Sequence, residues 1–110
     1  MSCKMIPAVV NNIKNEILKT VAVSKIYLFG SYARGTQTDD SDYDIFVVVP
    51  DNSIRPLEAM QKIYCSLALL RIPIPVDVLA SYENDFDKRK NLPTSIEKTI
   101  SNEGILLYEH

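Results

Sequence analysis

The stretch GSYARGTQTDDSDYD, residues 30–44, tells most about the fold and chemistry of this chain. It follows the short apolar run KIYLF at residues 25–29, which predicts a strand that ends at Gly30. Two of the three glycines in the chain, Gly30 and Gly35, lie within the stretch. Because glycine has no side chain and adopts positive φ easily, it suits a turn that a ligand approaches closely. The sequence therefore predicts a strand followed by a tight turn that is open to a ligand.

Two aspartates, Asp42 and Asp44, close the stretch at the start of a second strand, predicted over residues 43–49. Alternate residues of a strand share a face, so the two carboxylates should project together. Carboxylates held close together repel each other, and one of them tends to keep its proton. Mg²⁺ removes this conflict, since it favours oxygen ligands and usually retains water and phosphate oxygens. The pair therefore predicts a site for Mg²⁺ and a polyphosphate.

Asp77 is the third candidate ligand, because it is the only charged residue in the apolar run IPVDVLA at residues 74–80. A charge inside an apolar strand is costly unless it is paired or binds a metal. If this strand lies beside residues 43–49, Asp77 reaches the same metal site. Alternatively, Asp77 faces solvent on an edge strand, and the aspartates of residues 39–44 form an acidic turn. A calcium loop is disfavoured, because the glycine and glutamate that it needs at its sixth and twelfth positions are missing.

The turn at Gly30 supplies groups that bind anions. Backbone N–H groups at the start of the helical turn expected over residues 32–35 should point outward, and the Ser31 hydroxyl adds a donor. Arg34 is placed either to contact a phosphate or to lie in solvent. The Gly-Lys-Ser/Thr pattern of a P-loop is absent from the sequence. Gly30, Ser31 and Arg34 are therefore candidate nucleotide-binding residues of another kind of site.

The rest of the pattern predicts an α/β (α+β) fold, in which one domain over residues 1–110 has a mixed central sheet flanked by helices. Cys65 should lie on the apolar side of a helix as a small core residue, and Gly104 should end the last helix. Strands are predicted over 25–29, 43–49, 74–80 and 105–108. Helices are predicted over 6–21, 57–70 and from Thr94 or Ser95 to about 102, with polar loops over 36–41 and 82–91, the second with room for a short helix.

The composition excludes several functional classes. The formal net charge is −2, and no basic face is evident, so the usual electrostatic source of nucleic-acid binding is missing. No apolar run approaches the roughly 18 residues of a membrane span, and no secretory segment is visible. The spacing of the two cysteines suggests neither a zinc site nor a disulfide framework. We therefore expect a cytoplasmic protein without membrane or direct nucleic-acid contact, and its oligomeric state stays open.

At this point the sequence resembles a known family. Gly30-Ser31, ten residues and then Asp42-Tyr43-Asp44 resemble the signature of the DNA polymerase β-like nucleotidyltransferase superfamily. The fuller strings GSYARG and SDYD are similar to those of the minimal nucleotidyltransferases, or MNT proteins, and the resemblance covers nearly the whole chain. It implies a mixed sheet with flanking helices. It also implies that Asp42, Asp44 and a third acidic residue, matched by Asp77, bind Mg²⁺.

The resemblance further implies an activity and a partner. Gly30 and Ser31 would hold a nucleoside triphosphate, two Mg²⁺ ions would bind the aspartates, and Asp77 would help to deprotonate the acceptor. MNT proteins are commonly antitoxins of helical HEPN toxins, and such antitoxins can transfer AMP from ATP to a tyrosine hydroxyl of the toxin. Two alternatives stay open: a catalytically idle antitoxin that neutralises its partner sterically, and a small-molecule nucleotidyltransferase of the aminoglycoside-modifying type.

Overall fold

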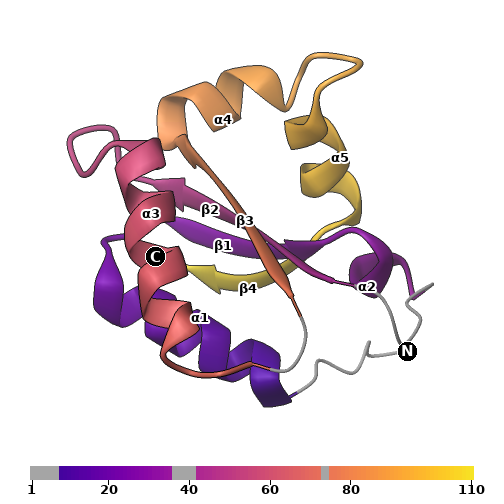
Figure 1. The fold of residues 1–110 in the computed structure, drawn as a ribbon. Coiled ribbons are helices and arrows are strands. Elements are labelled where there is room, and N and C mark those ends of the chain that lie inside the picture. Colours follow the sequence, from indigo (N-terminus) through magenta and orange to yellow (C-terminus); the bar gives the residue numbers. More distant parts are fainter. Residues whose placement is uncertain (1–7, 36–41, 73–74) are drawn as a thin grey trace.

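A computed structural model describes residues 8–35, 42–72 and 75–110 of the chain. Its core is a four-stranded sheet that carries helices on both faces (Figure 1). The predicted α/β class, with a mixed sheet and flanking helices, is confirmed. Along the chain the elements are α1 (Ala8–Thr20), β1 (Lys25–Phe29), α2 (Ser31–Arg34), β2 (Tyr43–Val49), α3 (Pro56–Ala68), β3 (Val76–Tyr82), α4 (Glu83–Arg89), α5 (Ile96–Glu103) and β4 (Ile105–Glu109).

The sheet is mixed, with the strand order β3-β2-β1-β4. β1 pairs antiparallel with both β2 and β4, whereas β2 and β3 run parallel and are joined through α3. β2 is a central strand, and its residues 45–49 are all buried. A strand that is covered on both faces needs apolar residues at successive positions, which explains the unbroken run IFVVV.

The two faces of the sheet carry cores of unequal size. Alternate residues of β2 point to opposite faces. Ile45 and Val47 belong to the larger core, which includes residues of α1 and α3. Phe46 belongs to the smaller core, in which it contacts Phe86 of α4 at a ring-centroid distance of 5.5 Å and packs near Ile100 of α5. The helices on the second face therefore cover the sheet less completely than α1 and α3 cover the first.

Several helix boundaries differ from the predictions. α1 begins at Ala8, and the two earlier positions of the predicted helix lie outside the described residues. Residues 82–91, predicted as a loop or a short helix, contain the short helix α4. α5 follows Ser95, whose Oγ accepts a hydrogen bond from the Lys98 N–H at 3.1 Å, so the second of the two proposed caps is the one that forms. Gly104 ends α5 as predicted, but in an extended conformation rather than a left-handed one.

The predicted position of Cys65 on the apolar side of its helix is wrong. Ile63 and Leu67 are buried, but Leu57 is 66% exposed and Cys65 is also exposed. Cys65 is two residues from both Ile63 and Leu67, and at 3.6 residues per turn this places it on the opposite side of the helix. The predicted core role of Cys65 is therefore wrong, because α3 contacts the sheet through a narrow face.

β3 is shifted by two residues from the predicted range of 74–80, and residue 74 lies outside the described residues. Its last two residues pair with the end of β2, so the parallel pairing extends to the last residue of that strand. The loop predicted over 36–41 also lies outside the described residues. Within the described ranges, no helix has both the length and the apolar character needed to cross a membrane.

Candidate active site

Gly30 and Asp44 lie against each other. Gly30 stands between β1 and α2, and α2 lies at one end of the sheet (Figure 1). Phe29, the last residue of β1, pairs with Asp44 of β2, so the next residue lies beside the Asp44 side chain. The Gly30 backbone has φ 75° and ψ −149°, a region that is essentially open only to glycine. A Cβ atom on Gly30 would lie 2.2 Å from Oδ2 of Asp44. The backbone conformation and the neighbouring carboxylate therefore both require glycine at this position.

Asp44 and Asp77 are direct neighbours on the parallel strands β2 and β3. Residues paired in register point to the same face of a sheet. Both carboxylates therefore lie on the face of the smaller core, because Phe46 follows Asp44 by two residues on β2. β3 is an edge strand, and Asp77 is exposed. The sequence left open whether Asp77 faces solvent on an edge strand or lies beside the other aspartates. In the structure Asp77 does both, because it is exposed on an edge strand and is the neighbour of Asp44.

The three candidate carboxylates act on one another through their charges. Burial raises the pKa of Asp44 above its ordinary value, and the negative charges of Asp77 and Asp42 raise it further. The Arg34 guanidinium opposes this rise in the pKa of Asp44. Charges shift a neighbouring pKa strongly only when they are close. The structure therefore brings Asp42, Asp44, Asp77 and Arg34 into one group.

α2 carries the other residues that the sequence predicts for nucleotide binding. It begins with Ser31, directly after Gly30, and its last residue is Arg34. The Nε–H of Arg34 donates a hydrogen bond to the Gly30 carbonyl oxygen at 3.4 Å. This bond ties the arginine side chain to the turn. Gly30, Ser31 and Arg34 therefore form one continuous turn that adjoins the aspartates.

Tyr32 and Tyr43 attach α2 to the start of β2, a contact that we did not infer from the sequence. Their ring centroids are 4.5 Å apart. Burial raises the pKa of Tyr43, and a hydrogen bond and Coulomb interaction with Tyr32 raise it further. Tyr43 lies in the larger core, on the face opposite Asp44. The sequence positions of the two tyrosines, one directly after Ser31 and one between the two aspartates, could have indicated this contact.

The donor set fits a hard divalent cation such as Mg²⁺. Within the described ranges, no three His, Cys, Asp or Glu side chains are gathered closely enough to enclose a metal ion by themselves. Mg²⁺ does not need such a cage, because it usually binds one or two carboxylates together with water and substrate phosphates. The candidate ligands are all carboxylates, and burial together with the charges of Asp77 and Asp42 raises the pKa of Asp44. A bound cation would oppose this rise.

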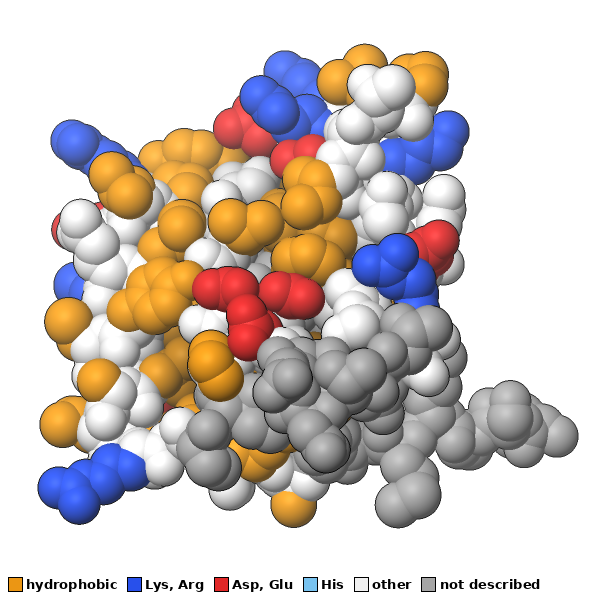
Figure 2. Space-filling view, turned by 45° about the vertical axis from the view of Figure 1, so that its right-hand side comes forward, with side chains coloured by type: hydrophobic (Ala, Val, Ile, Leu, Met, Phe, Trp, Pro, Cys, Tyr) orange, Lys and Arg blue, Asp and Glu red, His pale blue; other side chains and the backbone are white. Residues whose placement is uncertain are grey.

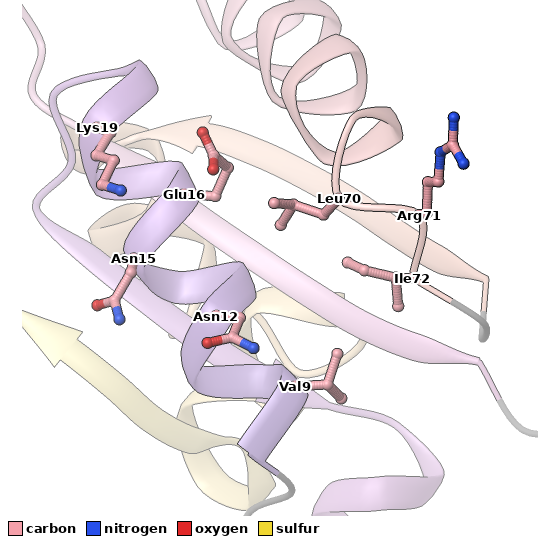
Figure 3. A pocket seen from close by; sticks show the side chains of 8 residues that line it. All are labelled: Val9, Asn12, Asn15, Glu16, Lys19, Leu70, Arg71 and Ile72. Carbon is pink, nitrogen blue, oxygen red and sulfur yellow. The ribbon is translucent and has the colours of Figure 1, made fainter.

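Among the described residues of the site, Asp77 is exposed, and Asp42 and Asp44 are half-buried. Figure 2 shows a group of acidic side chains on this side of the molecule, bordered by apolar side chains. A cavity of about 320 Å³ lies elsewhere, between α1 and the turn that contains Leu70, Arg71 and Ile72 (Figure 3). None of the candidate site residues lines that cavity. The Asp77 carboxylate is therefore accessible at the surface of the domain.

Residues 11–110 match the family described as polymerase β nucleotidyltransferase. This chain belongs to that family. The match begins inside α1 and includes all of the later helices and all four strands. The family resemblance inferred from residues 30–44 is thereby confirmed, and the chain is a nucleotidyltransferase. Nucleotidyltransferases of this superfamily generally use a divalent metal ion.

Individual relatives agree with the family assignment. The Putative protein adenylyltransferase MJ0604 of Methanocaldococcus jannaschii is 33% identical over 86 residues, which are 78% of this chain and 79% of that protein. The crystal structure of a toxin-antitoxin with AMP-PNP has a TM-score of 0.60 at 25% identity and covers 91% of this chain and 73% of its own. A mutant of the toxin-antitoxin MntA-HpeT has a TM-score of 0.63 at 21% identity, with 91% and 72% covered. This last likeness supports the fold.

Proposed function

We propose that this domain, taken as residues 1–110, is a Mg²⁺-dependent nucleotidyltransferase of the cytoplasm that transfers AMP from ATP to a hydroxyl group. The acceptor that we propose is a tyrosine of a helical HEPN-type toxin, for which this chain is the antitoxin. The main support is the position of Asp44, which lies against the Gly30 turn and has Asp77 as its register neighbour. A phosphate chain bound at the turn would lie next to these carboxylates.

The candidate residues have separate tasks in this proposal. Gly30 and Ser31 offer backbone N–H groups and a hydroxyl to the triphosphate, and Arg34 adds a positive charge. Asp42, Asp44 and Asp77 would hold Mg²⁺ together with water and the phosphates of the nucleotide, and the bound ion would neutralise phosphate charge and lower the pKa of the acceptor hydroxyl. Most of the rate enhancement then comes from positioning and from charge stabilisation.

The proposed bond changes are those of a substitution at the α-phosphorus of ATP. The acceptor oxygen forms a bond to this phosphorus, the bond to the oxygen that leads to the β-phosphate breaks, and pyrophosphate leaves. The proton of the acceptor hydroxyl passes to Asp77, the exposed carboxylate of an edge strand, which an incoming acceptor can reach. Asp44 is only partly exposed and lies against the turn, so it suits the phosphate side of the reaction.

The relatives support the partner and the acceptor that we propose. One is named a putative protein adenylyltransferase, and two of the structural neighbours are toxin-antitoxins, one of them crystallised with AMP-PNP. Asp77 is exposed, so a protein acceptor can reach it. A protein acceptor also agrees better with the name of the first of these relatives than an aminoglycoside does.

Transfer of label from α-phosphate-labelled ATP to the purified partner tests the proposal. Asp44→Asn should lower the labelling rate by about 10²–10³-fold, because it removes the central carboxylate of the site. Asp87→Asn is a matched control, since it removes an exposed carboxylate of α4 that pairs only with Lys90 among the described residues. Equal labelling by the wild-type and Asp44→Asn chains would reject the proposed chemistry.

A separate experiment tests whether this chain neutralises the toxin without transferring AMP to it. The variant with both Asp42→Asn and Asp44→Asn is expressed with the toxin at the level of the wild-type chain. If neutralisation requires AMP transfer, the cells should stop growing. Continued growth would mean that this chain inhibits its partner by covering it.

A further inference from the structure

The hydroxyl of Tyr64 makes two hydrogen bonds to one residue of the edge strand. It accepts a bond from the Val78 N–H at 2.8 Å and donates one to the Val78 carbonyl oxygen at 3.4 Å. Tyr64 lies on α3, and its residue surface is 42% exposed. A phenolic hydroxyl can act as donor and acceptor at once, which allows this double contact. Tyr64 therefore takes the place that a further strand would have beside Val78.

This contact fixes the peptide group next to Asp77. The N–H that Tyr64 holds belongs to the peptide bond that joins Asp77 to Val78. Because a peptide group is planar, fixing its N–H also fixes the direction of the Asp77 Cα–C bond. β3 is an edge strand, so β2 supports it on one side only. On the other side, Tyr64 holds the main chain immediately after the candidate proton acceptor.

We propose that Tyr64 is a positioning residue for Asp77. The proposal rests on the function proposed above, in which Asp77 receives the acceptor proton. Tyr64 does not contact the reacting groups; it sets the orientation of the β3 main chain from which the Asp77 carboxylate projects. Catalytic groups must be held within fractions of an ångström, and an exposed edge strand without this contact has more freedom to move.

The unmodified protein already allows one test. The Val78 N–H points away from β2 toward Tyr64, so without this bond it would face solvent at the sheet edge. We expect slow hydrogen exchange at Val78 when it is measured by nuclear magnetic resonance. Exchange at the rate of an unprotected amide would overturn the proposal, because Tyr64 would then not hold the strand in solution.

Tyr64→Phe tests the catalytic consequence, since it keeps the ring and removes only the hydroxyl. We expect kcat for AMP transfer to fall at least about fivefold, the factor that corresponds to one of the two hydrogen bonds that are lost. The KM for ATP should stay unchanged, because the Gly30 turn is on the other side of Asp44. Tyr82→Phe is the matched control, since Tyr82 ends the same strand and its hydroxyl makes no hydrogen bond to the described residues.

A double-mutant cycle with Asp77→Asn separates the possible outcomes. If Tyr64 acts through Asp77, then Tyr64→Phe should have no further effect on kcat in the Asp77→Asn background. An equal loss in both backgrounds, or unchanged kcat together with new self-association through the uncovered edge, would overturn the positioning role. Full activity of Asp77→Asn alone would instead overturn the proposed role of Asp77 and leave the observed contact as a structural one.

Discussion

Gly30 is constrained twice, by its own backbone and by the carboxylate beside it. Its φ of 75° with ψ of −149° costs any other residue about 1–3 kcal/mol. The Asp44 carboxylate occupies the space that a Cβ atom would need. Gly35 has the same φ of 75° with ψ of 20°, but nothing lies within 4 Å of the position of its missing Cβ. Substitution of Gly35 therefore tests backbone strain alone, whereas substitution of Gly30 tests backbone strain together with displacement of the Asp44 side chain.

The first prediction compares Gly30→Ala with Gly35→Ala. Both variants should lose stability, Gly35→Ala by about 1–2 kcal/mol, because alanine is strained at positive φ. Gly30→Ala should in addition lower AMP transfer by about 10²-fold, since it displaces the Asp44 carboxylate. Urea unfolding and labelling rates measure the two effects. Equal activities of the two variants would mean that contact between Gly30 and Asp44 does not matter for catalysis.

The second prediction follows from the raised pKa of Asp44. The folded state holds the Asp44 proton to higher pH than the unfolded state does, because burial and the charges of Asp77 and Asp42 raise its pKa. As pH rises from the ordinary aspartate pKa to the raised one, the folded state binds more protons, so the contribution of Asp44 to stability falls. Above the raised pKa the full destabilisation persists.

Asp44→Asn removes this titration. In metal-free buffer, the variant should therefore be more stable than the wild type at neutral pH, and the difference should vanish below the ordinary aspartate pKa. Thermal unfolding in the presence of a chelator across this pH range measures it. A variant that is less stable than the wild type at neutral pH would show that the Asp44 charge is compensated within the protein.

Among the secondary-structure elements, the strands were predicted more accurately than the helices. β1 and β2 have the predicted bounds, because apolar runs end there at turn residues. Cys65 was wrongly placed on the buried side of α3, since apolar residues at helical spacing do not reveal how much of the helix the sheet covers. The start of β3 was misplaced because apolar residues begin at Ile74, two positions before the strand, so the apolar run does not mark where pairing starts.

The third prediction concerns α5, which covers the second face of the sheet through Ile100. Ser95 caps this helix at its N-terminus. Ser95→Ala should lower the free energy of unfolding by about 1 kcal/mol, the usual effect of losing a cap. Urea unfolding measures the loss, and AMP transfer should remain at the wild-type rate, since Ser95 is outside the candidate site. Unchanged stability would contradict the capping role.

The whole molecule brings together residues that are far apart in sequence. The spacing within residues 30–44 was enough to predict that the Gly30 turn and the Asp44 carboxylate lie together, because Gly30 follows one strand and Asp44 lies at the start of the next. That Asp77 joins them depends on the parallel pairing of β3 with β2, which the sequence left open. The bond between Tyr64 and Val78 was not predictable, because nothing in the apolar pattern of α3 indicates where a hydroxyl reaches.

The fourth prediction concerns the stability of the whole fold. A ligand that binds only the folded state stabilises it by about 2.7 kcal/mol at a hundredfold excess over its Kd. For a domain of 110 residues, saturating MgATP should therefore raise the Tm by about 10 °C. Asp44→Asn should lose most of this shift, whereas Asp87→Asn should keep it. A wild-type Tm that does not respond to MgATP would contradict nucleotide binding at this site.

The parallel register of β2 and β3 also limits how such a sequence can change length. Adding one residue inside β3 before Asp77 would reverse the side on which its carboxylate emerges, because side chains alternate along a strand. The same addition in the connection between α3 and β3 leaves that alternation intact. Among homologous chains, insertions and deletions should therefore collect in the crossover, while the number of residues from the first pairing of β3 to its aspartate stays fixed.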